Sequence, residues 1–109
     1  PAKLDRRHAI RDRYRAGVED IEGVELMPRD PRGRPNGWLT LLTMDTSTGV
    51  TPHQLCARLE ALDIEARPAW KPMHLQPVFD GVPVLGGSVA EDLFDRGVIE
   101  VVGEAIRPR

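Results

Sequence analysis

Three prolines within ten residues constrain the fold of this chain more than any other feature. Pro68, Pro72 and Pro77 lie in the segment IEARPAWKPMHLQPVF, residues 64–79. Proline fixes φ near about −65° and lacks an amide donor, so this spacing excludes both an α-helix and a central β-strand. The sequence therefore predicts a short strand over residues 64–67 that leads into a stiff, extended loop.

Composition limits the size of the domain and its partners. A chain of 109 residues forms one small domain, and its net charge of −2 creates no field that would recruit nucleic acid. The single cysteine, Cys56, excludes an internal disulfide framework. No leader peptide and no membrane-spanning apolar run is present, which predicts a soluble, cytoplasmic protein.

Scattered histidines do not predict a metal site. His8, His53 and His74 are far apart in the sequence, and none of them has a zinc-ligand spacing with Cys56. Cys56 itself lies beside an apolar helix stripe, which is typical of a small buried side chain rather than a nucleophile.

Apolar spacing and capping residues place the helices. A helix is predicted over residues 5–20, and its arginine-rich outer face is expected to be solvated and partly paired with acidic residues. The stripe of this helix consists of Ile10, Tyr14, Val18 and Ile21, and its outer arginines are Arg6, Arg7, Arg11, Arg13 and Arg15. Thr51 and Gln54 form a capping box for a second helix with a buried stripe of Leu55, Leu59 and Leu62.

Two further helices are predicted in the last quarter of the chain. Ser88 and Glu91 form a second capping box, which opens a short helix that ends near Arg96 with Gly97 as a C-terminal cap. The tail VIEVVGEAI, residues 98–106, has apolar residues at helical spacing and is predicted to be a helix.

The order of elements gives the fold class. Residues 38–44, WLTLLTM, form the clearest strand, and near-continuous apolarity predicts a central position in its sheet. Strand, helix and strand then follow one another with short connections. We expect one α/β (α+β) domain over residues 1–109, with a small, mainly antiparallel sheet and helices packed chiefly on one face.

Several segments carry a family resemblance. Five segments are similar to parts of the C-terminal region of the DegT/DnrJ/StrS-type aminotransferases. They are RPAWKPMHLQP, RRHAIRDRY, GWLTLLTMD, GVTPHQLCARLEALDIEARP and VAEDLFDRG. The resemblance covers most of residues 6–97 and corresponds to the C-terminal small domain of these fold-type I enzymes. About fifteen residues of the family pattern are missing after Gly97.

The resemblance implies an activity that this chain does not carry alone. Family members use pyridoxal phosphate to move an amino group from glutamate to a nucleotide-linked keto sugar, and they act as homodimers. The cofactor's lysine belongs to a large N-terminal domain. We therefore expect a C-terminal fragment that helps to close the substrate site and to steady the dimer, without catalysis of its own.

The proline-rich loop supplies the candidate substrate-binding residues, which are Arg67, Trp70, Lys71 and His74. Arg67 could hold a phosphate or carboxylate, or brace the loop against an aspartate. His74 matches the family's histidine and could bind a sugar hydroxyl, carboxylate or phosphate, or tie the loop down. Trp70 could stack on a sugar or plug the domain interface, and Lys71 could be a ligand or only a solvated charge.

A second hypothesis from another class stays open. The chain could be a stand-alone, non-catalytic module that binds a partner or oligomerises through its exposed face.

Overall fold

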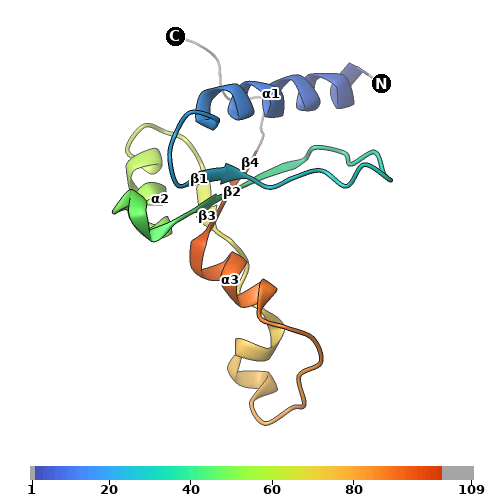
Figure 1. The fold of residues 1–109 in the computed structure, drawn as a ribbon, viewed down its shortest axis with the longest axis vertical. Helices are drawn as coiled ribbons and strands as arrows, with labels where there is room; N and C mark the ends of the chain where they lie inside the picture. The colour runs from blue at the N-terminus through green and yellow to red at the C-terminus, as the bar shows by residue number, and fades with distance from the viewer. Residues whose placement is uncertain (1, 102–109) are drawn as a thin grey trace.

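Residues 2–101 are described by a computed structural model, which contains one four-stranded sheet with flanking helices (Figure 1). The main elements are α1 (Ala2–Val18), β1 (Val24–Leu26), β2 (Leu39–Met44), α2 (Pro52–Glu60), β3 (Ala66–Pro68), α3 (Val89–Arg96) and β4 (Gly97–Val101). Single turns of 3₁₀ helix are η1 (Thr46–Thr48), η2 (Met73–Leu75) and η3 (Pro77–Phe79). The expected fold class is confirmed.

Every neighbouring pair of strands in the sheet is antiparallel, in the order β1-β2-β4-β3. In register, Leu42 of β2 lies opposite Val98 of β4, and Ile99 of β4 lies opposite Arg67 of β3. β2 and β3 therefore run parallel with β4 between them, and α2 makes the crossover. The buried apolar core includes Leu42, Val98 and Ile99, so the predicted central position of β2 is confirmed.

The tail helix predicted over residues 98–106 is wrong for residues 98–101, which form the inner strand β4. β4 pairs with β2 on one side and β3 on the other, and these two ladders outweigh the local helical spacing. Val98 is fully buried in this position. The rest of that predicted helix lies outside the described residues, and the missing family segment after Gly97 stays a prediction.

Helix α1 confirms the first predicted helix, but one of its expected solvated arginines is buried. Arg11 is only 5% exposed, and its Nη2 donates to the carbonyl oxygen of Met27 at 2.6 Å. Burial and the neighbouring Arg29 charge lower its pKa. The loop after β1 folds back along α1, where Arg34 approaches Asp5 to 3.4 Å. The start of this loop brings the carbonyl oxygen of Met27 to Arg11, which explains why Arg11 leaves solvent.

The capping box of α2 is confirmed. The backbone N–H of Gln54 donates to the Thr51 hydroxyl oxygen, and the backbone N–H of Thr51 donates to Gln54 Oε1 at 2.9 Å. Leu55 and Leu59 are half-buried. Leu62 is 69% exposed because the helix has already ended, so the predicted stripe is wrong for this residue.

The predicted caps of α3 are wrong at both ends. Ser88 makes no side-chain capping bond, and Glu91 is instead hydrogen-bonded by His74. Gly97 has φ −91° and ψ 140°, so it is the extended first residue of β4 rather than a left-handed cap. Its lack of a side chain is still required, because a Cβ would clash with the backbone oxygen of Leu93.

Residues 70–96, here called the arm, project from one end of the sheet (Figure 1). The arm is not the continuously extended loop that we predicted, because it contains two turns of 3₁₀ helix. The first turn, η2, follows directly after Pro72, and the second turn, η3, begins at Pro77. The fixed φ of proline suits the start of a helical turn. Pro68 lies in the edge strand β3, where its missing amide costs no ladder bond.

Candidate functional site

The four predicted substrate-binding residues lie along β3 and the arm. Arg67 is exposed, and its Nη2 donates to Glu65 Oε1 at 2.8 Å, so its acidic partner is a glutamate rather than an aspartate. Trp70 is 72% exposed and Lys71 is also exposed. These three side chains therefore present their functional groups outward, away from the domain's own core.

His74 is the most constrained of the four. Its Nε2 lies 2.7 Å from Glu91 Oε1, and this contact joins η2 to the first turn of α3. The His74 side chain is 22% exposed and that of Glu91 is 45% exposed. The bond has the geometry of a structural tie across the arm, and it leaves Nδ1 as the ring nitrogen that could meet a ligand.

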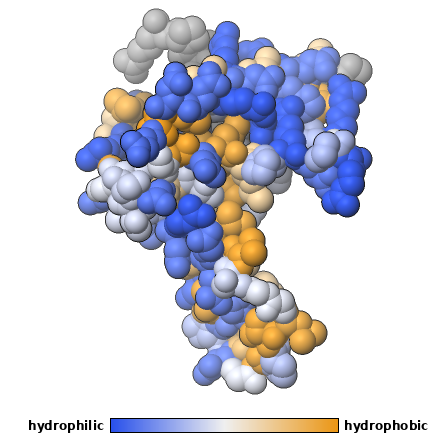
Figure 2. All heavy atoms as spheres, in the orientation of Figure 1, coloured by the Kyte–Doolittle hydropathy of each residue, from blue (hydrophilic) through white to orange (hydrophobic). Residues whose placement is uncertain are grey.

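Apolar side chains gather at the surface of the arm (Figure 2). Leu85 is 97% exposed, and the other exposed apolar residues of the arm are Trp70, Met73, Leu75, Val78, Val82, Val84 and Val89. An exposed cluster of this kind marks a surface that contacts another body. The arm is therefore the part of the described chain best suited to meet a second domain or chain.

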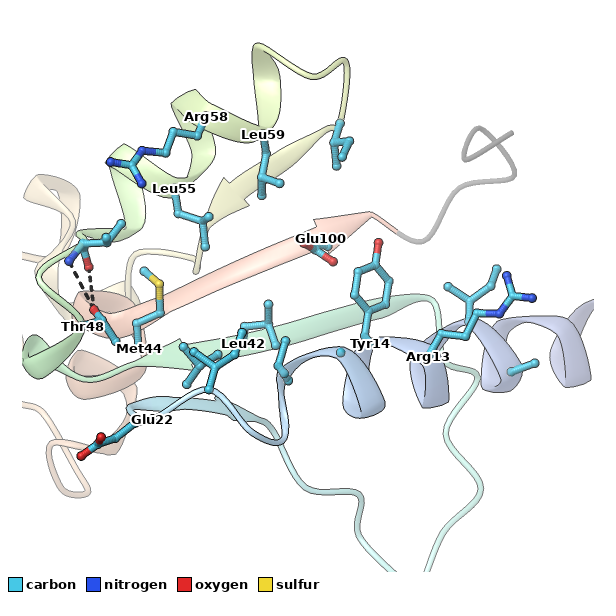
Figure 3. Close-up of a pocket in the computed structure, with 18 of the residues that line it drawn as sticks. Arg13, Tyr14, Glu22, Leu42, Met44, Thr48, Leu55, Arg58, Leu59 and Glu100 are labelled. Carbon is cyan, nitrogen blue, oxygen red and sulfur yellow. Dashed lines mark hydrogen bonds between the residues drawn. The ribbon is translucent and has the colours of Figure 1, made fainter. Parts of the chain in front are cut away.

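A groove that the sequence did not predict lies between α1, α2 and the sheet (Figure 3). It encloses about 1000 Å³ and is lined mainly by apolar side chains. These include Ile10, Tyr14 and Val18 of α1, Leu42 and Met44 of β2, Leu55 and Leu59 of α2, and Ile64. The sequence signal that relates to this groove is the apolar stripe of each helix, because both stripes were expected to face one sheet.

Glu100 is a buried carboxylate on the floor of this groove, and Tyr14 lies beside it (Figure 3). Glu100 is 6% exposed, and burial raises its pKa. Burial, together with the nearby Glu100 charge, raises the pKa of Tyr14 to about 12. None of the four predicted site residues lines this groove, so the chain presents two separate surfaces.

Other chemistry is limited within residues 2–101. This range contains no cluster of three or more His, Cys, Asp or Glu side chains that could hold a metal ion. Cys56 is half-buried, and burial raises the pKa of its thiol, which makes it a poor nucleophile. No helix in the described range is long and apolar enough to cross a membrane.

The fold and its arm define a small α+β domain built around a β2-α2-β3 crossover, with its chemically rich surface on a projecting loop. Comparison with known families places it further. The chain belongs to the DegT/DnrJ/EryC1/StrS aminotransferase family, whose model matches residues 2–102.

Similar proteins match most of this chain but are much longer. EpsN of Bacillus subtilis (strain 168), named as a candidate pyridoxal phosphate-dependent aminotransferase, is 43% identical over 102 aligned positions, which cover 88% of this chain and 25% of EpsN. DesI, solved in the presence of its TDP-sugar product, is 25% identical and superposes with a TM-score of 0.81. The match covers 98% of this chain and 28% of DesI. DesV of S. venezuelae, solved with a ketimine intermediate, shares the fold with a TM-score of 0.73 at 22% identity, covering 98% of this chain and 28% of DesV. The chain thus spans about a quarter of these relatives.

The described residues do not fit pyridoxal phosphate, the cofactor of this family. Its aldehyde needs a lysine held next to a phosphate-binding cradle. Lys3 and Lys71 are both exposed, and neither lines the groove. The described side chains therefore supply no lysine placed to hold this cofactor.

Proposed function

We propose that this chain works as the C-terminal domain of a pyridoxal-phosphate-dependent aminotransferase that acts on nucleotide-linked keto sugars in the cytoplasm. The observation that carries this proposal is the similarity to DesI, a protein solved with its TDP-sugar product, over 98% of the chain. In this proposal a large N-terminal domain supplies the cofactor and its lysine, and glutamate is the amino donor.

The arm and the neighbouring strand β3 form the substrate-facing surface in this proposal. Arg67, Trp70 and Lys71 present a fork of donors, an indole and an ammonium to the outside of the domain. These groups suit a phosphate and a sugar face. Contact of the apolar arm with the large domain excludes water from the substrate and contributes to homodimer stability.

His74 is held in place for this role. Glu91 accepts a hydrogen bond from Nε2 at 2.7 Å, which fixes the ring and directs Nδ1 away from the pair. Nδ1 then accepts a hydrogen bond from a sugar hydroxyl of the substrate, or donates one to a phosphate oxygen when both ring nitrogens carry a proton. Glu91 acts as a positioning residue, because it touches the histidine rather than the substrate.

The test begins with the coding sequence upstream of Pro1 and the polypeptide that it encodes. This polypeptide is incubated with pyridoxal phosphate, ¹⁵N-glutamate and a panel of nucleotide-linked keto sugars, and aminated products are measured by mass spectrometry. The proposal expects ¹⁵N in the sugar product, and His74→Ala should raise KM for the sugar more than it lowers kcat. Absence of a large domain upstream, or no transfer to any sugar, contradicts it.

The second candidate is a non-catalytic module, and the exposed arm also favours it. Leu85 at 97% exposure and Trp70 at 72% exposure would suit a partner protein or a second copy. Analytical ultracentrifugation of the full chain distinguishes the two functions. Stable self-association that is lost in Leu85→Asp, in a chain with no upstream domain, would favour the module.

A further inference from the structure

The loop that joins β1 to β2, residues 27–38, lies alongside α1 (Figure 1). A cleft of about 570 Å³ is lined by Arg11 of α1, by parts of this loop and by the start of β2. Both ends of the loop are tied to the helix. Arg11 Nη2 donates to the carbonyl oxygen of Met27 at 2.6 Å, and His8 Nε2 donates to the carbonyl oxygen of Pro35 at 2.8 Å. Hydrogen bonds therefore hold the walls of the cleft in place.

Two arginines in this cleft have guanidinium nitrogens without hydrogen-bond partners. Arg11 is 5% exposed, and within the described residues its Nη1 has no partner, nor do Nε and Nη2 of Arg29. Asp12 Oδ1 lies 3.9 Å from Arg29 Nη2, which is too long for a hydrogen bond. Burial and the neighbouring Arg29 charge lower the pKa of Arg11, so the two cations are close enough to repel each other. An anion bound between them would supply the missing acceptors and relieve the repulsion.

The other charged residues that line the cleft, Asp30 and Arg34, already have partners. Asp30 accepts a hydrogen bond from the Arg32 side chain at 2.8 Å. Arg34 lies 3.4 Å from Asp5. The two guanidinium groups without partners therefore leave a surplus of positive charge in the cleft. A phosphomonoester balances this surplus better than a carboxylate, because it carries about −1.5 to −2 charges at pH 7 and three acceptor oxygens.

We propose that this cleft binds a small organic phosphate, with the phosphate group held between Arg11 and Arg29. The planar forks of two guanidinium groups match the geometry of phosphate oxygens. The volume of the cleft is typical of a small-molecule site and exceeds what a bare phosphate ion fills. Met27 and Trp38, which are 42% and 55% exposed, also line the cleft and offer apolar surface to the organic part. Residues 66–96 do not line it, so this site does not depend on the substrate surface proposed above.

Isothermal titration calorimetry of the full chain, in a buffer without phosphate, tests the site. Phenyl phosphate is the probe, and benzoate and inorganic phosphate are the comparison ligands. We expect one phenyl phosphate per chain, bound about tenfold or more tightly than benzoate because it carries the second charge. It should also bind severalfold more tightly than inorganic phosphate, because its ring contacts the apolar lining. Absence of binding, or equal affinity for either comparison ligand, would overturn the proposal.

Two arginine variants locate the binding. Arg29→Gln removes one of the two cations and should weaken phenyl phosphate binding by about tenfold or more. Arg13→Gln is the matched control, because Arg13 is exposed on the opposite side of α1 and does not line the cleft. The control should change the affinity by less than about twofold, since salt screens an exposed charge. Equal weakening in the two variants, or unchanged binding in a folded Arg29→Gln chain, would overturn the proposal.

Nuclear magnetic resonance of the unaltered chain tests the part played by Arg11 without a substitution at this buried position. The Nε–Hε signals of Arg11 and Arg29 should shift as phenyl phosphate is added, and that of Arg13 should stay in place. Shifts of equal size at all three arginines, or no shift at Arg11, would contradict the site.

Discussion

Close packing around Gly97, the first residue of β4, predicts that an alanine at this position destabilises the domain. Gly97 is buried and extended at φ −91°, so alanine causes no backbone strain there. An added Cβ would clash with the backbone oxygen of Leu93 and would lie 2.7 Å from Ala69 Cβ and 3.1 Å from Leu41 Cδ1. The backbone oxygen cannot move without disturbing the junction of α3 and β4. Overpacking of this kind costs about 1–3 kcal/mol, and we expect Gly97→Ala to fall in the upper half of that range.

The assay is urea unfolding followed by circular dichroism, supported by the melting temperature. A loss of about 2–3 kcal/mol in the free energy of unfolding should lower Tm by roughly 10 °C or more in a domain of this size. Gly87→Ala is the matched control, because its Cβ would meet nothing within 4 Å, and it should change stability by less than about 0.5 kcal/mol. If Gly97→Ala is as stable as the control, the close packing at the start of β4 is wrong.

Four further predictions follow from the groove, the arm and the cap. Burial raises the pKa of Glu100 above its ordinary value of 4.5, so the contribution of Glu100 to stability falls as pH rises above that value. Glu100→Gln should therefore stabilise the chain at pH 7 and make the free energy of urea unfolding depend less on pH. An unchanged pH dependence would count against the buried carboxylate. Tyr14, the only tyrosine, should titrate near 12 by ultraviolet absorbance, with a lower midpoint in Glu100→Gln; a normal midpoint near 10 would be inconsistent with its burial. His74→Ala should speed amide exchange in η2 severalfold while changing the free energy of unfolding by less than about 1 kcal/mol. Glu91→Gln keeps an acceptor and should have a smaller effect. Equal exchange in the unaltered chain and both variants would refute a structural role for the His74–Glu91 bond. Thr51→Ala should cost about 1 kcal/mol of unfolding free energy in the same assay, and Thr51→Ser should restore it; no loss would contradict the cap.

Elements that depend on local signals could be predicted from the sequence. The capping box of Thr51 and Gln54 satisfies its own backbone groups within one turn, so the start of α2 needs no information from elsewhere. The β-forming run that ends at Met44 and the apolar spacing of α1 are also local, and both elements are confirmed. The fold class followed from the order of these elements.

Three of the wrong predictions involve partners that are distant in the sequence. Residues 98–101 have helical spacing, but two neighbouring strands supply ladders that favour an extended chain. Glu91 could cap α3 on sequence grounds, yet His74 reaches it from 17 residues away. Arg11 looks solvated until the loop after β1 supplies the carbonyl oxygen of Met27.

The candidate site was only partly accessible to sequence reasoning for the same reason. The proline spacing identified the loop that carries Arg67, Trp70, Lys71 and His74, and the structure places it on the edge strand and the projecting arm. The groove was missed because it requires the relative placement of α1 and α2, which their separate apolar stripes do not specify. The substrate role of the four loop residues stays a prediction.

The central claim is that the reactive amine for pyridoxal phosphate lies outside these residues, and an absorbance titration tests it most directly. The purified chain and its Lys71→Ala variant are titrated with pyridoxal phosphate, and the band of protein-bound cofactor is recorded before and after dialysis. We predict identical spectra for the two proteins, with no band that survives dialysis. A stable band that is present in the chain and lost in Lys71→Ala would contradict the account.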